Sequence, residues 1–258
     1  MTAAMLATGV LLCGVLLPAH GEAAAGKSAL ALAESMRAAR ESDGFELRIT
    51  LQGPGAAARD ALRIALIGQS REGRERLLVR GIAPAGIRGH AIVCERSADP
   101  GEEPSCVQDT SADTVRTDAM AGIFGSTLVA WDLMAPWWDW PVQVDEGPQA
   151  IAGHACTQVR SRPERRPVSG VSEALSCVDA RNGMAWKTTL FDSHHRVLRS
   201  IEARRDIRTQ AGHSTARSAA ITDADGAVTL VEVYAGDEHY QVRPDTFATS
   251  AAAAPAKD

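Results

Sequence analysis

Large aromatic side chains gather in one stretch of a chain that otherwise has few of them. Aromatic residues make up 4% of the 258 residues, yet residues 123–141, IFGSTLVAWDLMAPWWDWP, hold four of the five tryptophans. Rings concentrated in a loop-forming segment either pin it onto a core or line an apolar surface for a ligand. Residue types alone do not separate a structural plug from a ligand-binding lid. The candidates for binding at the mouth or lid are Phe124, Trp131, Met134, Trp137, Trp138 and Trp140.

Asp192, His194 and His195 lie close together and could act as a base or as metal ligands. They occupy an expected hairpin turn, where solvated polar residues are common. Neither GxSxG nor HExxH, motifs that carry hydrolytic or zinc chemistry, occurs in the chain. We therefore predict solvated turn residues, and a protein that is not an enzyme, with no catalytic residue, cofactor or metal.

A basic stretch lies in the segment between Cys156 and Cys177. A solvated loop is the default interpretation, and the alternative is docking to anionic lipid head groups or to an acidic partner. The residues are Arg160, Arg162, Arg165 and Arg166.

The first residues indicate export. Residues 1–25 contain LATGVLLCGVLLP, an apolar run too short to span a bilayer, followed by small residues that suit a signal peptidase. We expect this signal peptide to be cleaved and the protein to reside in the periplasm. No second apolar segment of membrane length follows, so we expect a soluble mature protein. A net charge of −5 argues against a nucleic-acid partner.

Four cysteines remain once Cys13 is lost with the signal. An even number in an oxidising compartment predicts disulfides, and the absence of CxxC spacing disfavours zinc. Three pairings are possible. Proximity in the sequence favours Cys94 with Cys106 and Cys156 with Cys177.

Hydrophobic periodicity predicts one helix followed by many strands. Ser28 can cap a helix whose apolar residues share one face, and Gly44 is expected to end it. The period then changes to 2, which is typical of strands with one wet face. Residues 96–103 are expected to form a loop, and residues 249–258 a disordered tail. The strands are expected at residues 45–52, 62–66, 77–80, 90–94, 155–160, 184–191, 196–203 and 227–234.

This pattern predicts a mainly β (α+β) fold in one domain, residues 27–248. Sequential antiparallel hairpins with few helices and no internal repeat give one curved sheet or an incomplete β-barrel.

Four motifs in the same order resemble the outer-membrane lipoprotein-sorting proteins, the LolA-like periplasmic carriers. They are RGIAPAGIRGHA (residues 80–91), FGSTLVAWDL (124–133), IAGHACTQV (151–159) and DGAVTLVEVYAGDEHYQVRPDTF (225–247). The resemblance implies a strongly curved antiparallel sheet forming an incomplete barrel, with an N-terminal helix and a helical or loop lid on its apolar concave side. It also implies that the acyl chains of a lipoprotein or lipid are held between sheet and lid and delivered to the outer membrane.

The implied partners are an acylated lipoprotein or lipid and an inner-membrane exporter, with transient membrane contact by a monomer. A 16-carbon acyl chain in water costs about 12 kcal/mol, at roughly 0.8 kcal/mol per methylene, so a carrier needs an enclosed apolar groove. The alternative on the same fold is an envelope sensor or regulatory module that recognises lipoproteins or a membrane-anchored partner. An exported hydrolase ranks last, because no polar constellation supports it.

Overall fold

A computed structural model provides the structure of the chain. It describes residues 28–40, 42–53, 61–97, 99, 102–110, 113–208 and 214–248. The expected signal peptide and C-terminal tail lie outside these residues. Within the described part of the chain, no helix is long and apolar enough to cross a membrane.

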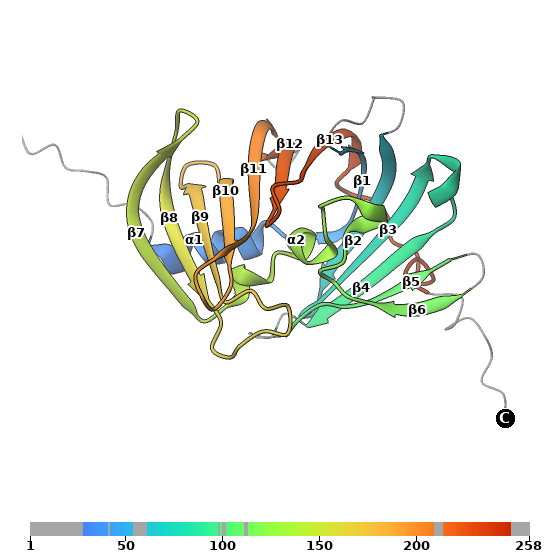
Figure 1. The fold of residues 1–258 in the computed structure, drawn as a ribbon, viewed down its shortest axis with the longest axis horizontal. Helices are drawn as coiled ribbons and strands as arrows, with labels where there is room; N and C mark the ends of the chain where they lie inside the picture. The colour runs from blue at the N-terminus through green and yellow to red at the C-terminus, as the bar shows by residue number, and fades with distance from the viewer. Residues whose placement is uncertain are drawn as a thin grey trace, which may run out of the picture.

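In the part of the chain that the structure describes, thirteen antiparallel strands form a single sheet that does not close into a barrel (Figure 1). The spatial order is β6-β5-β4-β3-β2-β1-β13-β12-β11-β10-β9-β8-β7, so β6 and β7 are the two edges. The strands are β1 (Ser42–Gln52), β2 (Leu62–Arg71), β3 (Arg74–Ala83), β4 (Ala91–Ser97), β5 (Ser105–Asp109), β6 (Thr114–Thr117), β7 (Val142–Ile151), β8 (His154–Arg162), β9 (Glu173–Asp179), β10 (Met184–Phe191), β11 (Val197–Arg208), β12 (Ser214–Asp223) and β13 (Val228–Asp237). The predicted incomplete barrel is confirmed.

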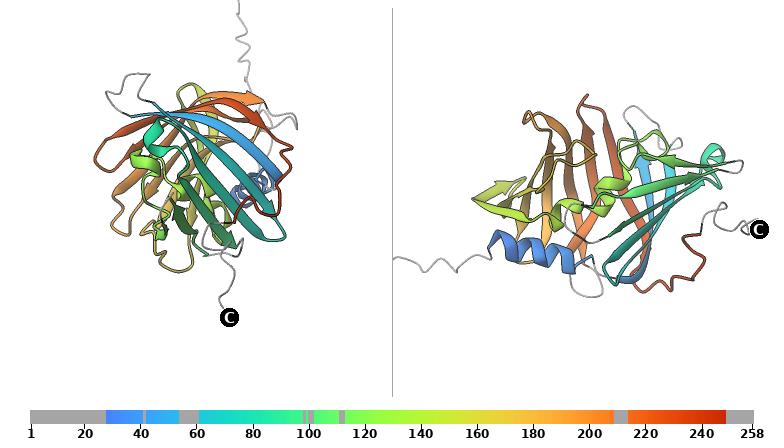
Figure 2. Two further views of the ribbon diagram at one scale, coloured as in Figure 1. Left: turned by 90° about the vertical axis from the view of Figure 1, so that its right-hand side faces the viewer. Right: turned by 90° about the horizontal axis from the view of Figure 1, so that it is seen from below.

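The sheet is bent into a trough. In Figure 1 strands β7–β10 form one wall and β2–β6 the other, with α2 (Ala130–Met134) between them, and Figure 2 shows the same curvature from two further directions. The first and last strands of the chain meet in the middle of the sheet. Glu46 on β1 lies opposite Asp237 on β13, and this ladder joins the two walls.

The N-terminal helix α1 (Ala29–Ala38) is capped as the sequence predicts. The Ser28 side chain accepts a hydrogen bond from the Ala31 N–H, at 3.2 Å. The apolar face of the helix, including Leu32 and Ala33, is buried, and the helix packs against β7, β8 and the short 3₁₀ helix η4 (Pro136–Asp139). A second short 3₁₀ helix, η2 (Ala85–Ile87), follows β3.

The prediction that Gly44 ends the helix is wrong. The helix ends at Ala38, and Gly44 lies inside β1. A β-carbon at Gly44 would sit 2.3 Å from the carbonyl oxygen of Tyr240, so a glycine is needed where the C-terminal segment crosses the strand. That segment ends with Phe247, which packs on the outer face of the sheet against Ile67, Leu78 and Val93.

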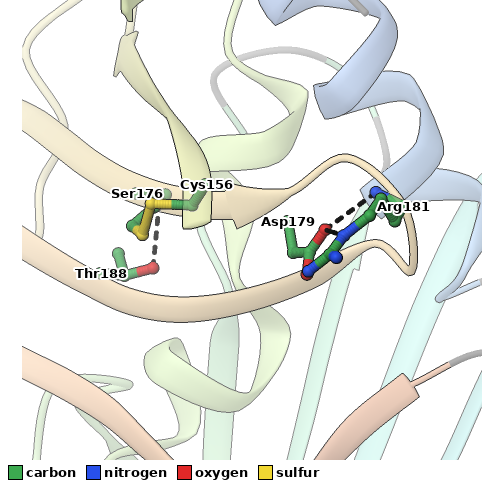
Figure 3. Close-up of a disulfide and its surroundings, with 6 residues drawn as sticks. Cys156, Ser176, Asp179, Arg181 and Thr188 are labelled. Carbon is green, nitrogen blue, oxygen red and sulfur yellow. Dashed lines mark hydrogen bonds and ion pairs between the residues drawn. A yellow bond between two sulfur atoms is a disulfide. The ribbon is translucent and has the colours of Figure 1, made fainter. Parts of the chain in front are cut away.

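Both disulfides have the pairing that sequence proximity favours. Cys94 and Cys106 lie directly opposite each other on β4 and β5, and Cys156 and Cys177 join β8 to β9. Figure 3 shows the second disulfide beside the buried hydrogen bond between the Ser176 and Thr188 hydroxyls, which are 2.9 Å apart. Each disulfide therefore ties neighbouring strands within one wall.

Replacing both cysteines of one disulfide should lower the free energy of unfolding by about 3 kcal/mol. The bridges span 12 and 21 residues, and loop closure of this length removes about that much entropy from the unfolded chain. We expect the Cys156→Ala/Cys177→Ala and Cys94→Ala/Cys106→Ala variants to lose similar amounts in urea denaturation. A loss below about 1 kcal/mol for either would contradict this expectation.

Candidate functional site

The aromatic stretch fills the trough as a separate body, residues 119–141, which we call the plug. It comprises a 3₁₀ turn, η3 (Ile123–Gly125), followed by α2 and η4. The plug contributes no strand to the thirteen-stranded sheet, and its one β-bridge, Gly122 to Val129, is internal. The view from below in Figure 2 shows α2 inside the trough.

The four tryptophans of the plug are packed side chains in this conformation. Their exposed fractions are 0% for Trp131, 3% for Trp137, 2% for Trp138 and 3% for Trp140. The Trp131 ring centroid lies 5.3 Å from that of Trp137 and 6.2 Å from that of Trp140, distances at which tilted aromatic pairs attract. The stretch thus covers the concave side, as a plug and a lid both would. Its role in binding a ligand stays a prediction.

Met134 and Phe124 complete the predicted set. Met134 is buried with the tryptophans, at 4% exposure. Phe124 is only half-buried and has a φ of 49°, in the left-handed region that a non-glycine residue seldom adopts. Phe124 is the member of the set that faces a pocket.

The plug covers an apolar concave surface. Branched aliphatic side chains from both walls form one continuous core with it. Among them are Ile49, Leu51, Ile64, Leu66, Leu77, Val79, Ile92, Val159, Val178 and Leu190. Without the plug, this face of the sheet would be open to water.

A buried ion cluster fastens the η4 end of the plug. Asp139 lies 2.8 Å from Arg40 and 2.8 Å from Arg96, and Glu75 on β3 bridges the same two arginines. The Arg40 guanidinium also donates to the backbone oxygen of Met134, at 2.6 Å. The Arg96 side chain is fully buried, so the cluster holds its charges away from water.

A second ion pair fastens α2 to β11, the strand next to the β7–β10 wall. The Arg199 guanidinium on β11 donates to both carboxylate oxygens of Asp132, at 2.7 to 3.1 Å, and to the Thr127 backbone oxygen. Burial raises the pKa of Asp132, and the charge and hydrogen bonds of Arg199 oppose that rise. Thr127 is further held by Thr229 on β13, whose hydroxyl accepts from the Thr127 N–H at 2.9 Å.

Glu103 connects the plug to the loop between β8 and β9. One of its carboxylate oxygens accepts from the Trp131 indole N–H at 3.1 Å, and the other accepts from the Ser169 hydroxyl at 3.2 Å. Burial raises the pKa of Glu103, while these two hydrogen bonds and the charge of Arg96 lower it. This polar link anchors a tryptophan that is otherwise surrounded by apolar atoms.

Two pockets remain beside the plug. One, of about 220 Å³, lies between the plug and β4–β6, with Phe124, Asp118 and Gln108 in its lining. The other, of about 340 Å³, lies near the β12–β13 turn, with Thr127 and Asp223 in its lining. Ligand sites commonly measure about 300 to 1,000 Å³. Each of these two pockets is therefore at or below the lower end of that range.

The histidine pair lies in a turn, as predicted. Asp192 accepts from the backbone N–H groups of His194 and Arg196, which fixes the tight turn between β10 and β11. The His195 ring stacks on Phe191, with centroids 4.7 Å apart. Among the described residues, no group of three or more metal-ligating side chains is placed to hold an ion.

The basic stretch divides into two parts, which corrects its interpretation as one solvated loop. Arg160 and Arg162 lie on β8 and pair with the buried carboxylate of Glu173. Only Arg165 and Arg166 are in the loop, where both are exposed. The strand continues through Arg162 because these ion pairs satisfy its charged side chains.

Sequence reasoning missed the residues that fasten the plug. Asp132 and Asp139 interrupt the aromatic stretch, and carboxylates inside an apolar run indicate buried ion pairs. Their partners are distant in the sequence and carry no local signal: Arg40 lies in the turn after α1, Arg96 on β4 and Arg199 on β11.

This geometry defines a class of fold: an open half-barrel whose concave side is filled by another segment of the chain. No protein-family profile matches the sequence, and no curated protein matches it. Its fold is the LolA-like fold, as solved structures show. The chain is similar to a domain described as an outer membrane lipoprotein-sorting protein from Vibrio parahaemolyticus, with a TM-score of 0.73, 13% identity and coverage of 85% of this chain and 95% of that one.

Two further solved structures share the fold. A DUF1329 family protein from Desulfovibrio piger has a TM-score of 0.76 and 14% identity, with 86% of this chain and 97% of that one covered. A LolA superfamily protein from Nitrosomonas europaea has a TM-score of 0.67 and 15% identity, with 86% and 98% covered. At these identities the likeness establishes the fold alone.

Removing the buried carboxylate of Asp132 should be strongly destabilising. Asp132→Ala leaves Arg199 buried without its ion pair, which typically costs about 3 to 5 kcal/mol. The control is Arg205→Ala, which breaks an exposed pair with Glu232 and should cost at most about 1 kcal/mol. Urea denaturation of both variants measures the difference. Equal losses would show that Asp132 does not fasten the plug.

Glu103→Gln should remove a pH dependence of stability. The pKa of Glu103 is raised above its ordinary value of 4.5, so the folded protein keeps a proton that the unfolded chain has already lost. This contribution to stability is therefore lost as the pH rises through the raised pKa. We expect the melting temperature of the wild type, relative to the variant, to fall over that window. A constant difference from pH 4 to 8 would contradict the expectation.

Proposed function

We propose that this protein is a periplasmic carrier that binds the acyl chains of a lipoprotein or lipid within the trough and helps to deliver them to the outer membrane. The observation that carries the proposal is an apolar concave sheet covered by a segment that is not part of the sheet. An apolar sheet face has to be buried against another element, and a cover that is not part of the strand ladder can be displaced while the ladder stays intact.

The plug can leave without breaking the sheet. It is fastened by side chains, chiefly Asp132 and Asp139, and donates nothing to the ladder between strands. Displacing it would expose an apolar channel between the walls. An acyl chain could then replace the tryptophans, so that one apolar surface substitutes for another.

We propose that binding involves this displacement, because each of the two pockets beside the plug is at or below the lower end of the usual size of a ligand site. The pockets of about 220 and 340 Å³ have different linings and share only Gly125. We therefore propose that Phe124, Met134 and the four tryptophans contact the acyl chain as the plug moves aside. Cleavage of a signal peptide and an oxidising compartment belong to the same proposal, and the two disulfides support it.

The filled interior also favours a second candidate. An envelope sensor or regulatory module on this fold would recognise a lipoprotein or membrane-anchored protein from outside and would not need to hold a free acyl chain. Such a module should bind no acyl probe even when the plug is loosened.

A photoactivatable 16-carbon fatty acid tests the carrier. We expect labelled peptides from the plug and from the concave strands β1–β3. We also expect Asp139→Ala to speed uptake several-fold, because Arg40 and Arg96 lose a partner that fastens the plug. Hydrogen exchange of residues 119–141 should rise in the same variant.

The matched control is again Arg205→Ala, which removes an arginine ion pair from an exposed site. It should leave labelling and exchange unchanged. Labelling confined to the outer face near Phe247, or no labelling of Asp139→Ala despite faster exchange in the plug, would refute the carrier and favour the sensor.

A further inference from the structure

The loop between β8 and β9, residues 163–170, presents the most exposed large hydrophobic side chain in the described part of the chain. Val168 is 96% exposed, whereas the next, Val115, is 53% exposed. Single exposed valines are common on protein surfaces. A valine with almost no intramolecular contact, at the tip of a loop, is a side chain that gains from any apolar surface brought to it.

The tip is an ordered turn. The Gly170 N–H donates to the Pro167 carbonyl oxygen at 3.2 Å, which places Val168 and Ser169 at the two central positions of a turn. Gly170 has a φ of +78°, a conformation that suits glycine. Ser169 is anchored below by its hydrogen bond to Glu103. The loop therefore holds Val168 outward.

The charges beside Val168 are available to a partner. Arg165 and Arg166 are exposed, and neither has an ion-pair partner among the described residues, unlike Arg160 and Arg162 on the preceding strand. Glu164 is the one carboxylate within residues 163–170. The loop thus carries a net charge of +1 (two arginines and one glutamate) on a chain whose net charge is −5.

Neighbouring segments extend the apolar character of this end of the sheet. Because the strands are antiparallel, the start of β7 and the start of β11 lie at the same end as the β8–β9 loop. Val142 on β7 is 42% exposed, and Val197 on β11 is 49% exposed. Figure 1 shows the loop projecting beyond the strands at the lower end of this wall.

We propose that the β8–β9 loop is a docking surface for an anionic lipid bilayer. Val168 enters the interfacial region, and Arg165 and Arg166 bind head-group phosphates. An apolar tip next to unpaired cations matches a surface that offers anions above hydrocarbon, and such binding is reversible. An acidic surface alone would satisfy the arginines but not the valine, so a protein partner would also need an apolar pocket for a single side chain. The inference stands whether or not the trough carries lipid.

Docking at this loop would bring the membrane to the end of the trough that leads to the plug. Ser169 follows Val168 directly, and Glu103 joins Ser169 to the indole of Trp131. A docked loop would therefore be linked to Trp131 through the two hydrogen bonds of Glu103.

Vesicle sedimentation with the full chain tests the proposal. The vesicles contain either phosphatidylcholine alone or phosphatidylcholine with 30% phosphatidylglycerol, in low salt. We expect binding to the anionic vesicles and its loss at high salt. Arg165→Ala/Arg166→Ala should weaken partitioning by roughly 25-fold, and Val168→Asp by about tenfold. Melting temperatures should not change, because all three side chains are exposed.

Two control variants match these changes elsewhere. Arg204→Ala/Arg208→Ala removes the same charge at the opposite end of the sheet, and Val115→Asp makes the same apolar-to-acidic change on β6. Neither control should alter binding. The proposal is overturned by binding that the loop variants do not weaken, by equal binding to both kinds of vesicle, or by no vesicle binding at all. An absence of vesicle binding would favour an acidic protein as the partner of this loop.

Discussion

The apolar concave face of an unclosed sheet is the constraint on which the rest of this structure depends. The inward side chains of a small closed barrel fill its interior, but here β6 and β7 do not meet and the concave face needs a cover. Burial comes from residues 119–141 together with α1, and this accounts for the four tryptophans placed there in a chain with 4% aromatic residues. Tryptophan covers much apolar area per residue, so a short segment suffices to fill a wide trough.

In the proposed carrier, polar fastening is what would make such a cover reversible. Buried ion pairs contribute little net stability, since desolvation offsets most of the attraction, but they specify one arrangement and fail abruptly when a partner is lost. Asp132 and Asp139 place these contacts at two points of the plug. Asp132 reaches Arg199 on β11, and Asp139 reaches Arg40 after α1 and Arg96 on β4. A cover held by apolar packing alone would have no such defined points of release.

Local patterns in the sequence predicted the elements that have regular alternation or a clear cap. They failed where contacts between distant parts of the chain determine the structure. The helix after Ser28 and strands such as β1 and β10 are confirmed. Strand β7 was missed because it is largely exposed on both faces and contains Pro148, and β12 because its small polar residues lack a period. The aromatic stretch was located correctly. Its ion-pair partners come from segments distant in the sequence, and no local pattern reveals such contacts.

The ladder between β1 and β13 has a consequence for how the protein is made. These strands are separated by nearly the whole domain, yet they pair at the centre of the sheet. The wall from β2 to β6 can form early, but it cannot be joined to the other wall until the ribosome has synthesised residue 237. Contacts of such long sequence separation slow folding. The chain therefore stays incompletely folded throughout translation, the condition in which a polypeptide can be threaded through a secretion channel.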